Sequence, residues 1–457
     1  MSRLFPGRAS GVVQGVLLGT AVLIAGCGGS DTPATTPVTT PPQLDCACPA
    51  MPVQEVGLVA SQDLAENQTA VDPLLVMANN NLGLTVLNSL LSQGASGNTA
   101  IAPVSLAESL ELAYNGAGGT TQQAMAQVLQ LDAPGVVQPG GLSVQQLNAD
   151  NAALQAALYN PDAKVSLLTA SALGTDFIGS NPTYDAFNRV NTSYYGADAA
   201  VLPPMGTPTE DAQAIDNFIS FYTYRQIAAI LAAGSYNVTA NNILLANSLY
   251  IQATWLVPFS PPMTLPATFT NSAGVQTSVT QMGMIASLPY LQGADFQAVS
   301  LPYGAGKRLA MLVVLPDAGT DLNTFVAGVT AATVEQWESE LQSQEVGLSL
   351  PRFTSSYVGS LQNALTSLGM GVAFDSSNAN FSGLAAGDYL QDVLHGVVVS
   401  VNENGTSVTP PSVTGGQSNG PVAPVQLTVS RPFFYAIRDN QSGELLVIGV
   451  VTAPGSG

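Results

Sequence analysis

The distribution of apolar residues divides the chain into an earlier part with helical periodicity and a later part with strand-like runs. The apolar segment Leu74–Leu91 is the first predicted helix. The next has apolar side chains at i, i+4, i+7 and i+8, which are Leu106, Leu110, Ala113 and Tyr114. Asn115–Gly119 ends this helix, and another is predicted to start at Thr120 or Thr121. A further amphipathic helix over Asp211–Leu231 has one apolar face, formed by Ile215, Phe218, Ile219 and Tyr222.

Apolar runs of strand length follow from residue 242 onward. These runs are Asn242–Ile251, Phe296–Pro302, Leu309–Pro316, Val346–Leu350 and Val393–Val401. A helix is predicted over Gly359–Leu368. Two final runs, Phe433–Ile437 and Leu445–Val451, flank the turn sequence Asn440-Gln441-Ser442-Gly443 and predict a hairpin. Helices followed by strands, without regular βαβ alternation, favour an α+β fold over a doubly wound one.

A long segment rich in Gly, Pro, Ser and Thr separates two of the strand-like runs near the C-terminus. It spans Val401–Phe434, whereas connections in compact domains are usually about 2–6 residues long. It is not a linker, because the piece that follows it, Pro432–Pro454, is too short to bury a core of its own. The sequence therefore predicts a long exposed loop whose two ends are held by one domain.

The first 26 residues have the pattern of a secretory signal peptide. Arg3 and Arg8 precede an apolar stretch, Val12–Ala25, that is too short and wrongly flanked for an ordinary membrane span. Its ending, Leu23-Ile24-Ala25-Gly26-Cys27, resembles a bacterial lipobox, which implies cleavage before Cys27 and lipidation of that residue. Gly28, rather than Asp, then favours export to the outer membrane. A plain signal peptide and an uncleaved anchor are the alternatives.

Residues 27–56 are predicted to form a disordered tether rich in Pro and Thr, which leaves residues 57–457 for a single folded domain. Folded structure is expected to begin between Val56 and Pro73. Cys46 and Cys48 lie in the tether, too close together for an unstrained disulfide. With one histidine in the chain they cannot complete a four-ligand zinc site, so no metal and no cofactor is expected.

The charge balance excludes one class of partner. The chain has a formal net charge of −20, and its only lysines are Lys164 and Lys307. Such a chain has no electrostatic attraction for polyanions, so nucleic acid is not expected as a partner.

Several short motifs occur in an order that matches a known family. They are Ala102-Pro103-Val104-Ser105, Phe187-Asn188 with Tyr195-Gly196-Ala197-Asp198, Asn247-Ser248-Leu249-Tyr250 with Trp255-Leu256-Val257-Pro258-Phe259, Leu350-Pro351-Arg352-Phe353, His395 through Glu403 with Gly405-Thr406, and Arg431-Pro432-Phe433-Phe434. From about Pro73 to Pro454 the chain resembles a serpin. The resemblance implies a helical N-terminal half packed on a large mixed β-sheet, further smaller sheets and a long exposed reactive loop, here residues 403–430.

The resemblance also implies a suicide mechanism of protease inhibition, and the chain is expected to be a monomer. The lipobox adds the expectation that it is secreted and lipid-anchored to the bacterial outer membrane or cell surface. A protease cuts the loop, and the N-terminal part of the loop then inserts as a strand into the main sheet. Small uncharged residues must form the hinge that enters first. The hinge is assigned to Glu403, Gly405, Thr406, Ser407, Val408 and Thr409.

Counting along the loop from both ends, with the spacings that the resemblance to serpins implies, places the scissile bond within Ser418–Pro421, so that Ser418, Asn419 and Gly420 are the candidates. The loop beyond the hinge contains no Lys or Arg before Arg431. The target protease is therefore expected to be of the serine or cysteine class and not trypsin-like. Elastase-like, subtilisin-like and Asn-cleaving enzymes fit this loop.

Two prolines directly after the hinge support an alternative function. Pro410 and Pro411 supply no N–H to a sheet ladder and are normally excluded from central strands. The alternative is a non-inhibitory serpin-fold surface binding protein in which these prolines block insertion.

The single histidine suggests catalysis at first sight, but no nucleophile motif accompanies it. A hydrolase is the least favoured of the three functions, and the chain is expected not to be an enzyme. By resemblance His395 belongs to the shutter beneath the opening sheet, with hydrogen bonds to Asn247 and Ser105. Trp255 corresponds to the breach where the loop enters, and Glu403 is expected to anchor the hinge through a charge pair with an unidentified partner.

Overall fold

The computed structural model describes residues 71–132, 141–158, 161–175, 182–195, 208–223, 225–231, 242–407 and 424–455. All of them belong to one compact unit, Gln54–Gly457. The signal peptide, the tether with Cys27, Cys46 and Cys48, and residues 408–423 of the loop lie outside the described residues.

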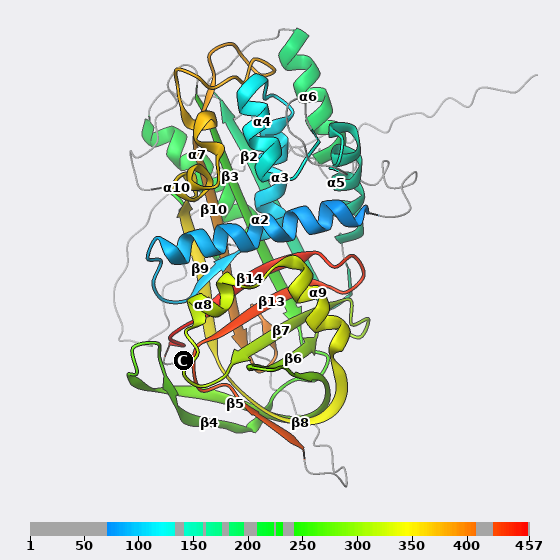
Figure 1. Cartoon of the computed structure of the whole chain (residues 1–457), viewed down its shortest axis with the longest axis vertical. Coiled ribbons are helices and arrows are strands. Elements are labelled where there is room, and N and C mark those ends of the chain that lie inside the picture. The colour runs from blue at the N-terminus through cyan, green and yellow to red at the C-terminus, as the bar shows by residue number, and fades with distance from the viewer. Residues whose placement is uncertain are drawn as a thin grey trace, which may run out of the picture. The chain divides into compact units, whose positions relative to one another are not determined.

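The helices α2 to α7 precede most of the strands along the chain, and shorter helices lie between the later strands (Figure 1). They are α2 (Pro73–Ser92), α3 (Pro103–Tyr114), α4 (Gly119–Val128), α5 (Val144–Leu158), α6 (Pro182–Tyr195), α7 (Pro208–Tyr222), α8 (Leu322–Ala327), α9 (Ala331–Glu340), α10 (Gln362–Ser367) and the 3₁₀ helix η1 (Met370–Phe374). The Asp72 carboxylate caps α2 by accepting a hydrogen bond from the backbone N–H of Leu74. By length and composition α2 could cross a membrane, but most of it is buried inside the domain.

A five-stranded sheet includes the first residues of the long loop, Gly405 and Thr406. Its order is β2 (Val165–Thr175), β3 (Asn242–Thr254), β11 (Gly405–Thr406), β10 (Tyr389–Asn402) and β9 (Phe353–Ser360). β3 and β10 also pair with each other directly, in parallel, from Tyr389 opposite Asn242 to Val397 opposite Leu249. The short strand β11 lies between them beyond the end of that pairing.

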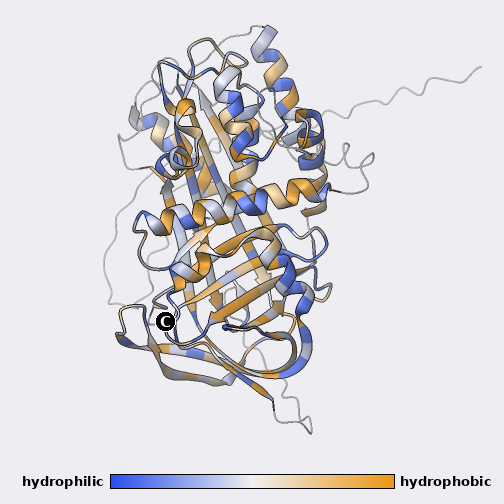
Figure 2. Cartoon of the chain, viewed as in Figure 1, coloured by the Kyte–Doolittle hydropathy of each residue, from blue (hydrophilic) through white to orange (hydrophobic). Residues whose placement is uncertain are grey.

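The second sheet has nine strands in the described part of the chain. Its order is β1 (Thr99–Ile101), β14 (Leu445–Val451), β13 (Phe433–Asp439), β7 (Leu309–Pro316), β6 (Phe296–Pro302), β5 (Gln276–Gln292), β8 (Gln342–Pro351) and β12 (Val425–Thr428), with β4 (Ser260–Thr270) on β5. β7 is apolar along almost its whole length, and its ribbon is coloured hydrophobic (Figure 2). Every residue of β7 is buried, as expected for a strand covered on both faces.

The α+β prediction is confirmed, and the predicted strands and final hairpin are present. Two boundaries were wrong, and one strand in the earlier half was not predicted. The helix predicted to reach Leu231 ends at Tyr222, the helix predicted from Gly359 begins at Gln362, and the earlier half contains the strand β2. The loop predicted over 403–430 is joined to both sheets at its ends, because residues 403–406 are buried in the five-stranded sheet and β12 pairs with β8.

Candidate functional site

The start of the long loop is already part of the five-stranded sheet. Gly405 and Thr406 pair with Asn402 and Val401 of β10 on one side. On the other side they pair with the last two residues of β3, Thr254 and Ala253. Thr406 is completely buried. Ser407 then has a φ of 51°, and its N–H donates to the carbonyl of Ser400 at 2.6 Å.

Gly405 is required by this close approach. Its φ is 155°, and a Cβ at this position would lie 1.9 Å from the carbonyl oxygen of Ala253. Because that oxygen belongs to the backbone of β3, it cannot move aside without disturbing the strand. Only glycine therefore allows the chain to enter between β3 and β10 here.

Gly405→Ala is expected to expel β11 from the sheet. The clash exceeds what local relaxation absorbs, so exchange of the Thr406 amide hydrogen should become at least about tenfold faster. Hydrogen exchange measured on the intact chain checks this. Gly274→Ala is the matched control, since Gly274 also has a positive φ, 77°, but has nothing within 4 Å of the added carbon. Unchanged protection of Thr406 in the first variant would contradict the steric argument.

An aromatic cluster surrounds the buried threonine. The hydroxyls of Thr406 and Tyr303 are 2.5 Å apart, and the Tyr303 ring stacks on Trp255 with centroids 4.3 Å apart. Trp255 donates its indole N–H to the carbonyl of Asn402 at 2.9 Å, and its backbone N–H to that of Asn404 at 2.8 Å. Burial raises the pKa of Tyr303 far above its ordinary value, so this phenol stays neutral. Trp255 therefore fixes the turn between β10 and β11 through hydrogen bonds from both its main chain and its side chain.

The hinge glutamate is anchored by an arginine. Arg352 contacts both carboxylate oxygens of Glu403, with Nη2 2.7 Å from Oε1 and Nε 3.0 Å from Oε2. The hydroxyl of Thr264 donates to the same carboxylate at 2.9 Å. Burial acts to raise the pKa of Glu403, but the hydrogen bonds from Arg352 and Thr264 outweigh it, and the pKa lies below its ordinary value. The partner that the sequence left open is thus Arg352.

The anchor gives the hinge a dependence on acidic pH. Because the pKa of Glu403 is lower in the folded chain than its ordinary value of 4.5, the pair contributes its full stability above that value and loses it as the pH falls. Amide exchange at Gly405 and Thr406 should therefore become faster, after correction for the intrinsic rate, between pH 6 and pH 3.5. Glu403→Gln should remove this dependence, whereas Glu335→Gln, at a side chain that is 72% exposed, should keep it. A dependence that survives Glu403→Gln would assign it to another group.

His395 and Asn247 lie opposite each other in the parallel pairing of β10 with β3. His395 Nδ1 is 2.5 Å from Asn247 Oδ1, and Nε2 accepts the backbone N–H of Ala102 at 3.0 Å. The Asn247 amide donates to the carbonyl of Leu394 at 3.1 Å. Burial lowers the pKa of His395 to about 3, so the imidazole is neutral with its proton on Nδ1.

Ser105 lies beside Asn247 as expected, but its hydroxyl does not bond to His395. Its hydroxyl reaches Asn247 Oδ1 at 3.5 Å and the carbonyl of Ala102 at 3.4 Å, at the limit of hydrogen bonding, and the second partner of His395 is the backbone of Ala102. Both ring nitrogens of His395 are thereby used. Neither is left to activate a nucleophile.

The structure brings together two groups of the predicted site residues. Glu403, Gly405, Thr406, Ser407 and Trp255 lie at the entrance, where β11 enters between β3 and β10. Ser105, Asn247 and His395 form the second group, farther along these two strands. The remaining predicted residues lie outside the described residues, namely Val408, Thr409, Pro410, Pro411, Ser418, Asn419, Gly420 and Cys27. Sequence reasoning missed the roles of Tyr303 and Thr264. Tyr303 directly follows the predicted strand Phe296–Pro302, but no pattern linked it to residue 406.

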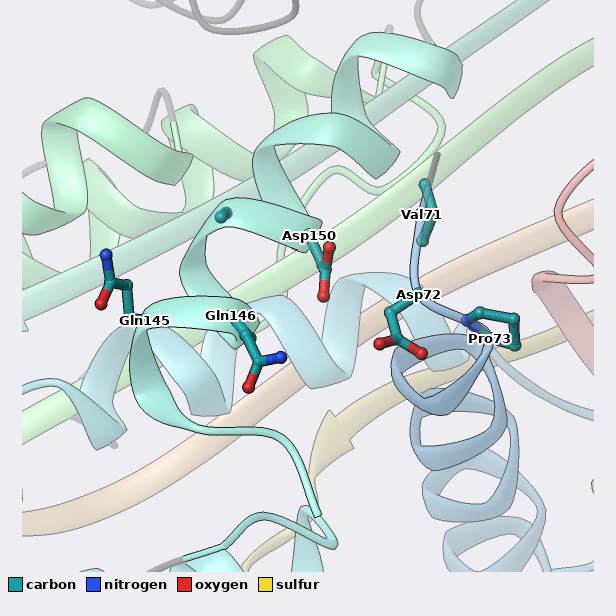
Figure 3. A pocket seen from close by; sticks show the side chains of 7 residues that line it. Val71, Asp72, Pro73, Gln145, Gln146 and Asp150 are labelled. Atoms are coloured by element: carbon teal, nitrogen blue, oxygen red, sulfur yellow. The ribbon is translucent and has the colours of Figure 1, made fainter. Parts of the chain in front are cut away.

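A pocket of about 450 Å³ lies elsewhere, at the starts of α2 and α5 (Figure 3). Asp72 and Asp150 face each other across it, beside Gln145 and Gln146. Its lining contains no nucleophile paired with a base. The site that the structure singles out is therefore the entrance between β3 and β10.

Comparison with known proteins agrees with this architecture. Residues 77–454 match the model of the family described as serpin (serine protease inhibitor), so the chain belongs to the serpin family. It is 27% identical to serpin B6 of Macaca fascicularis, over 83% of this chain and 100% of that protein. It is also 27% identical to a serine protease inhibitor of Cyanea capillata, over 82% of this chain and 97% of the relative.

Solved structures show the same fold. The native state of tengpin, a thermophilic serpin, superposes with a TM-score of 0.72 and 24% sequence identity, over 84% of this chain and 96% of that one. The fold and the family thus support protease inhibition in general, with a protease as the partner.

Proposed function

We propose that this serpin is a protease inhibitor that acts by inserting its cleaved loop between β3 and β10 and is tethered outside the cell by a lipid on Cys27. One observation carries the mechanism. The hinge residues Gly405 and Thr406 are hydrogen-bonded between these two strands before any cleavage. A loop that starts inside the sheet needs only to continue along the same register.

The register gives the depth that each further residue would reach. Thr406 lies opposite Ala253 and Val401, so each step along the loop moves one residue back along both strands. Residues 407–409 would lie between the parts of β3 and β10 that are not paired with each other, beyond the pair Leu249 and Val397. Residue 410 would arrive between Leu249 and Val397, which is the first existing pair. Residue 412 would arrive between His395 and Asn247.

The two prolines thus coincide with the point where insertion must begin to separate paired strands. Proline cannot donate to either ladder, so these steps break existing bonds and form fewer new ones. Insertion beyond residue 409 therefore competes with hydrolysis of the acyl-enzyme. If hydrolysis is faster, the chain would not inhibit and would instead be a surface binding protein. The experiment must distinguish this alternative from inhibition.

Incubation of the purified chain with elastase-like, subtilisin-like, Asn-cleaving and trypsin-like proteases separates the two functions. A complex that survives SDS denaturation, with cleavage within residues 418–421, is expected for at least one of the first three. Cleavage without a complex, and without a rise in thermal stability, would replace inhibition by the alternative. Labelling with a radioactive fatty acid, lost in Cys27→Ala, tests the tether separately.

A further inference from the structure

Three glutamates far from the loop are buried together. Glu108 and Glu111 lie one turn apart on α3, a helix in which every residue is buried. Glu444 directly precedes β14. Their exposed fractions are 5%, 1% and 0%. Glutamate is almost never fully buried unless a partner compensates its charge.

Glu444 is held in the interior by its neighbours in the chain. The side chain of Asn80, from α2, donates to the carbonyl of Gly443 at 3.0 Å and accepts the N–H of Leu445 at 2.8 Å. The residues on both sides of Glu444 are thereby fixed to α2. Both carboxylate oxygens of Glu444 are buried and lack a hydrogen bond of ordinary geometry, and the group that stabilises their charge is the side-chain amide of Asn79 on α2.

The partners of the other two glutamates are neutral amides. The side-chain N–H of Asn151, on α5, lies 2.5 Å from Oε2 of Glu111. Gln155, also on α5, hydrogen-bonds Glu108. An amide stabilises a carboxylate less than a cation would.

The elements packed around the three glutamates supply no cation to them. α2, α4, β1, β2, β3 and β14 contain no charged residue. On α5 the charged residue is Asp150, which faces Asp72 (Figure 3). α6 contributes Tyr195, whose hydroxyl donates to Asn148, together with Asp185 and the exposed Arg189.

The strand before Glu444 has its charges engaged elsewhere. Asp439 on β13 pairs with Arg308 at 2.9 Å. Arg438 passes beside Gly443, but its charge acts on Glu335, 3.9 Å away, and on Glu338. Within the described part of the chain, the three glutamates therefore form no salt bridge.

We propose that Glu108, Glu111 and Glu444 form a proton-binding cluster that joins α3 to the β13–β14 hairpin, so that the folded domain loses stability as protons leave it above neutral pH. The packing admits neutral carboxyl groups and opposes three mutually repelling carboxylates. The inference rests on the cluster alone and does not depend on loop insertion.

The direction of titration agrees with the geometry. Burial raises the pKa of Glu108 to about 7. Burial, with the charge of Glu108, raises that of Glu111 to about 8. Burial also raises the pKa of Glu444, helped by the charges of Glu111, Glu108 and Asp439 and opposed by Asn79. Because these values lie above the ordinary 4.5, the folded chain holds more protons than the unfolded chain, and its stability falls as the pH rises.

Burial also raises the pKa of three carboxyl groups outside the cluster, those of Asp150, Glu338 and Asp392, so the Glu111→Gln and Glu444→Gln variants are needed to separate the cluster from them. The chain has one histidine, His395, which is neutral when folded and therefore acts in the opposite direction, making the fold more stable as the pH rises. Its effect between pH 6.5 and pH 8.0 is about twofold in the unfolding equilibrium, since an unfolded histidine has a pKa of about 6.5. The glutamates act more strongly over the same interval, by up to about tenfold per pH unit for each proton released.

Proton release on unfolding tests the proposal directly. Unfolding the intact chain with urea at pH 7, in weak buffer with a pH indicator, should release about two protons per molecule. Glu111→Gln should release about one proton fewer. Glu335→Gln, at an exposed side chain, should release the same number as the unaltered chain. Unfolding without release, or with equal release from Glu111→Gln, would overturn the proposal.

The urea midpoint gives a second readout. It should fall between pH 6.5 and pH 8.0 in the unaltered chain and in Glu335→Gln, and it should fall less in Glu111→Gln and Glu444→Gln. Glutamine matches the neutral carboxyl in shape, so these variants should fold. If either variant fails to fold, proton release from the unaltered chain still decides the question. An equal fall in all four chains would contradict the assignment to this cluster.

Discussion

A chain carrying Pro410→Thr and Pro411→Ala is expected to divert at least about tenfold more of the target protease into covalent complex than the unaltered chain does. Each proline removes a ladder bond worth about 1 kcal/mol, and unsatisfied carbonyls add about 1–3 kcal/mol. A gain of about 1.4 kcal/mol in the insertion step already gives a factor of ten in rate. Densitometry of SDS gels, at several ratios of inhibitor to protease, measures how many chains are consumed per complex.

Pro421→Ala is the matched control for this experiment. Residue 421 lies at or beyond the predicted scissile bond and would not enter the sheet, so this substitution should leave the partition unchanged. An unchanged partition in the double variant as well would mean that the prolines do not limit insertion. The register argument would then fail, while the inhibitory function itself would still stand on the presence of a complex.

Thr406→Arg is expected to abolish the covalent complex and leave only cleavage. The threonine side chain is 0% exposed and bonded to the Tyr303 hydroxyl beside the Trp255 ring. An unpaired guanidinium at this position costs several kcal/mol of desolvation. The hinge should therefore leave the sheet, and insertion would have to bury the charge again. The same protease panel and gel assay measure this outcome.

Thr428→Arg provides the same chemical change at an exposed position on β12 and should retain complex formation. Thr406→Val separates the two contributions of the residue, because it removes the hydroxyl but introduces no charge. This variant should lower the free energy that keeps β11 in the sheet by only about 1 kcal/mol. Complex formation by Thr406→Arg at the normal level would show that burial of residue 406 is not needed for inhibition.

The strands most easily predicted from the sequence were those buried on both faces. β7 is a continuous apolar run and β10 is mostly apolar from Val393 to Val401, which a pattern identifies without knowledge of their neighbours. β2 was missed because its Ser, Thr, Ala and Gly residues have no clear period. β4 was missed because it contains prolines, which it tolerates as a strand paired on one side with β5.

Contacts distant in sequence account for the other differences. The helix α7 ends early because the segment after it turns back, and the Asp216 carboxylate accepts hydrogen bonds from the backbone of Ile230 and Leu231. Glu403 was recognised as an anchor, but Arg352 is one of ten basic residues in the chain. Only the fold places it 2.7 Å from the carboxylate. Local patterns contain no information on which of the ten is closest.

The junction between β3 and β10 is parallel, whereas β11 is antiparallel to both strands. Each loop residue that inserts beyond Thr409 would replace one parallel pairing, between β3 and β10, by two antiparallel pairings, one with each strand. Antiparallel pairing is slightly more stable per residue than parallel pairing. The sheet therefore has its weaker kind of pairing along the line where a new strand would enter. Before cleavage the loop is fixed at both ends and cannot use this difference. A cut would release one end of the loop. Each residue inserted after the prolines would then form more strand pairing than it breaks.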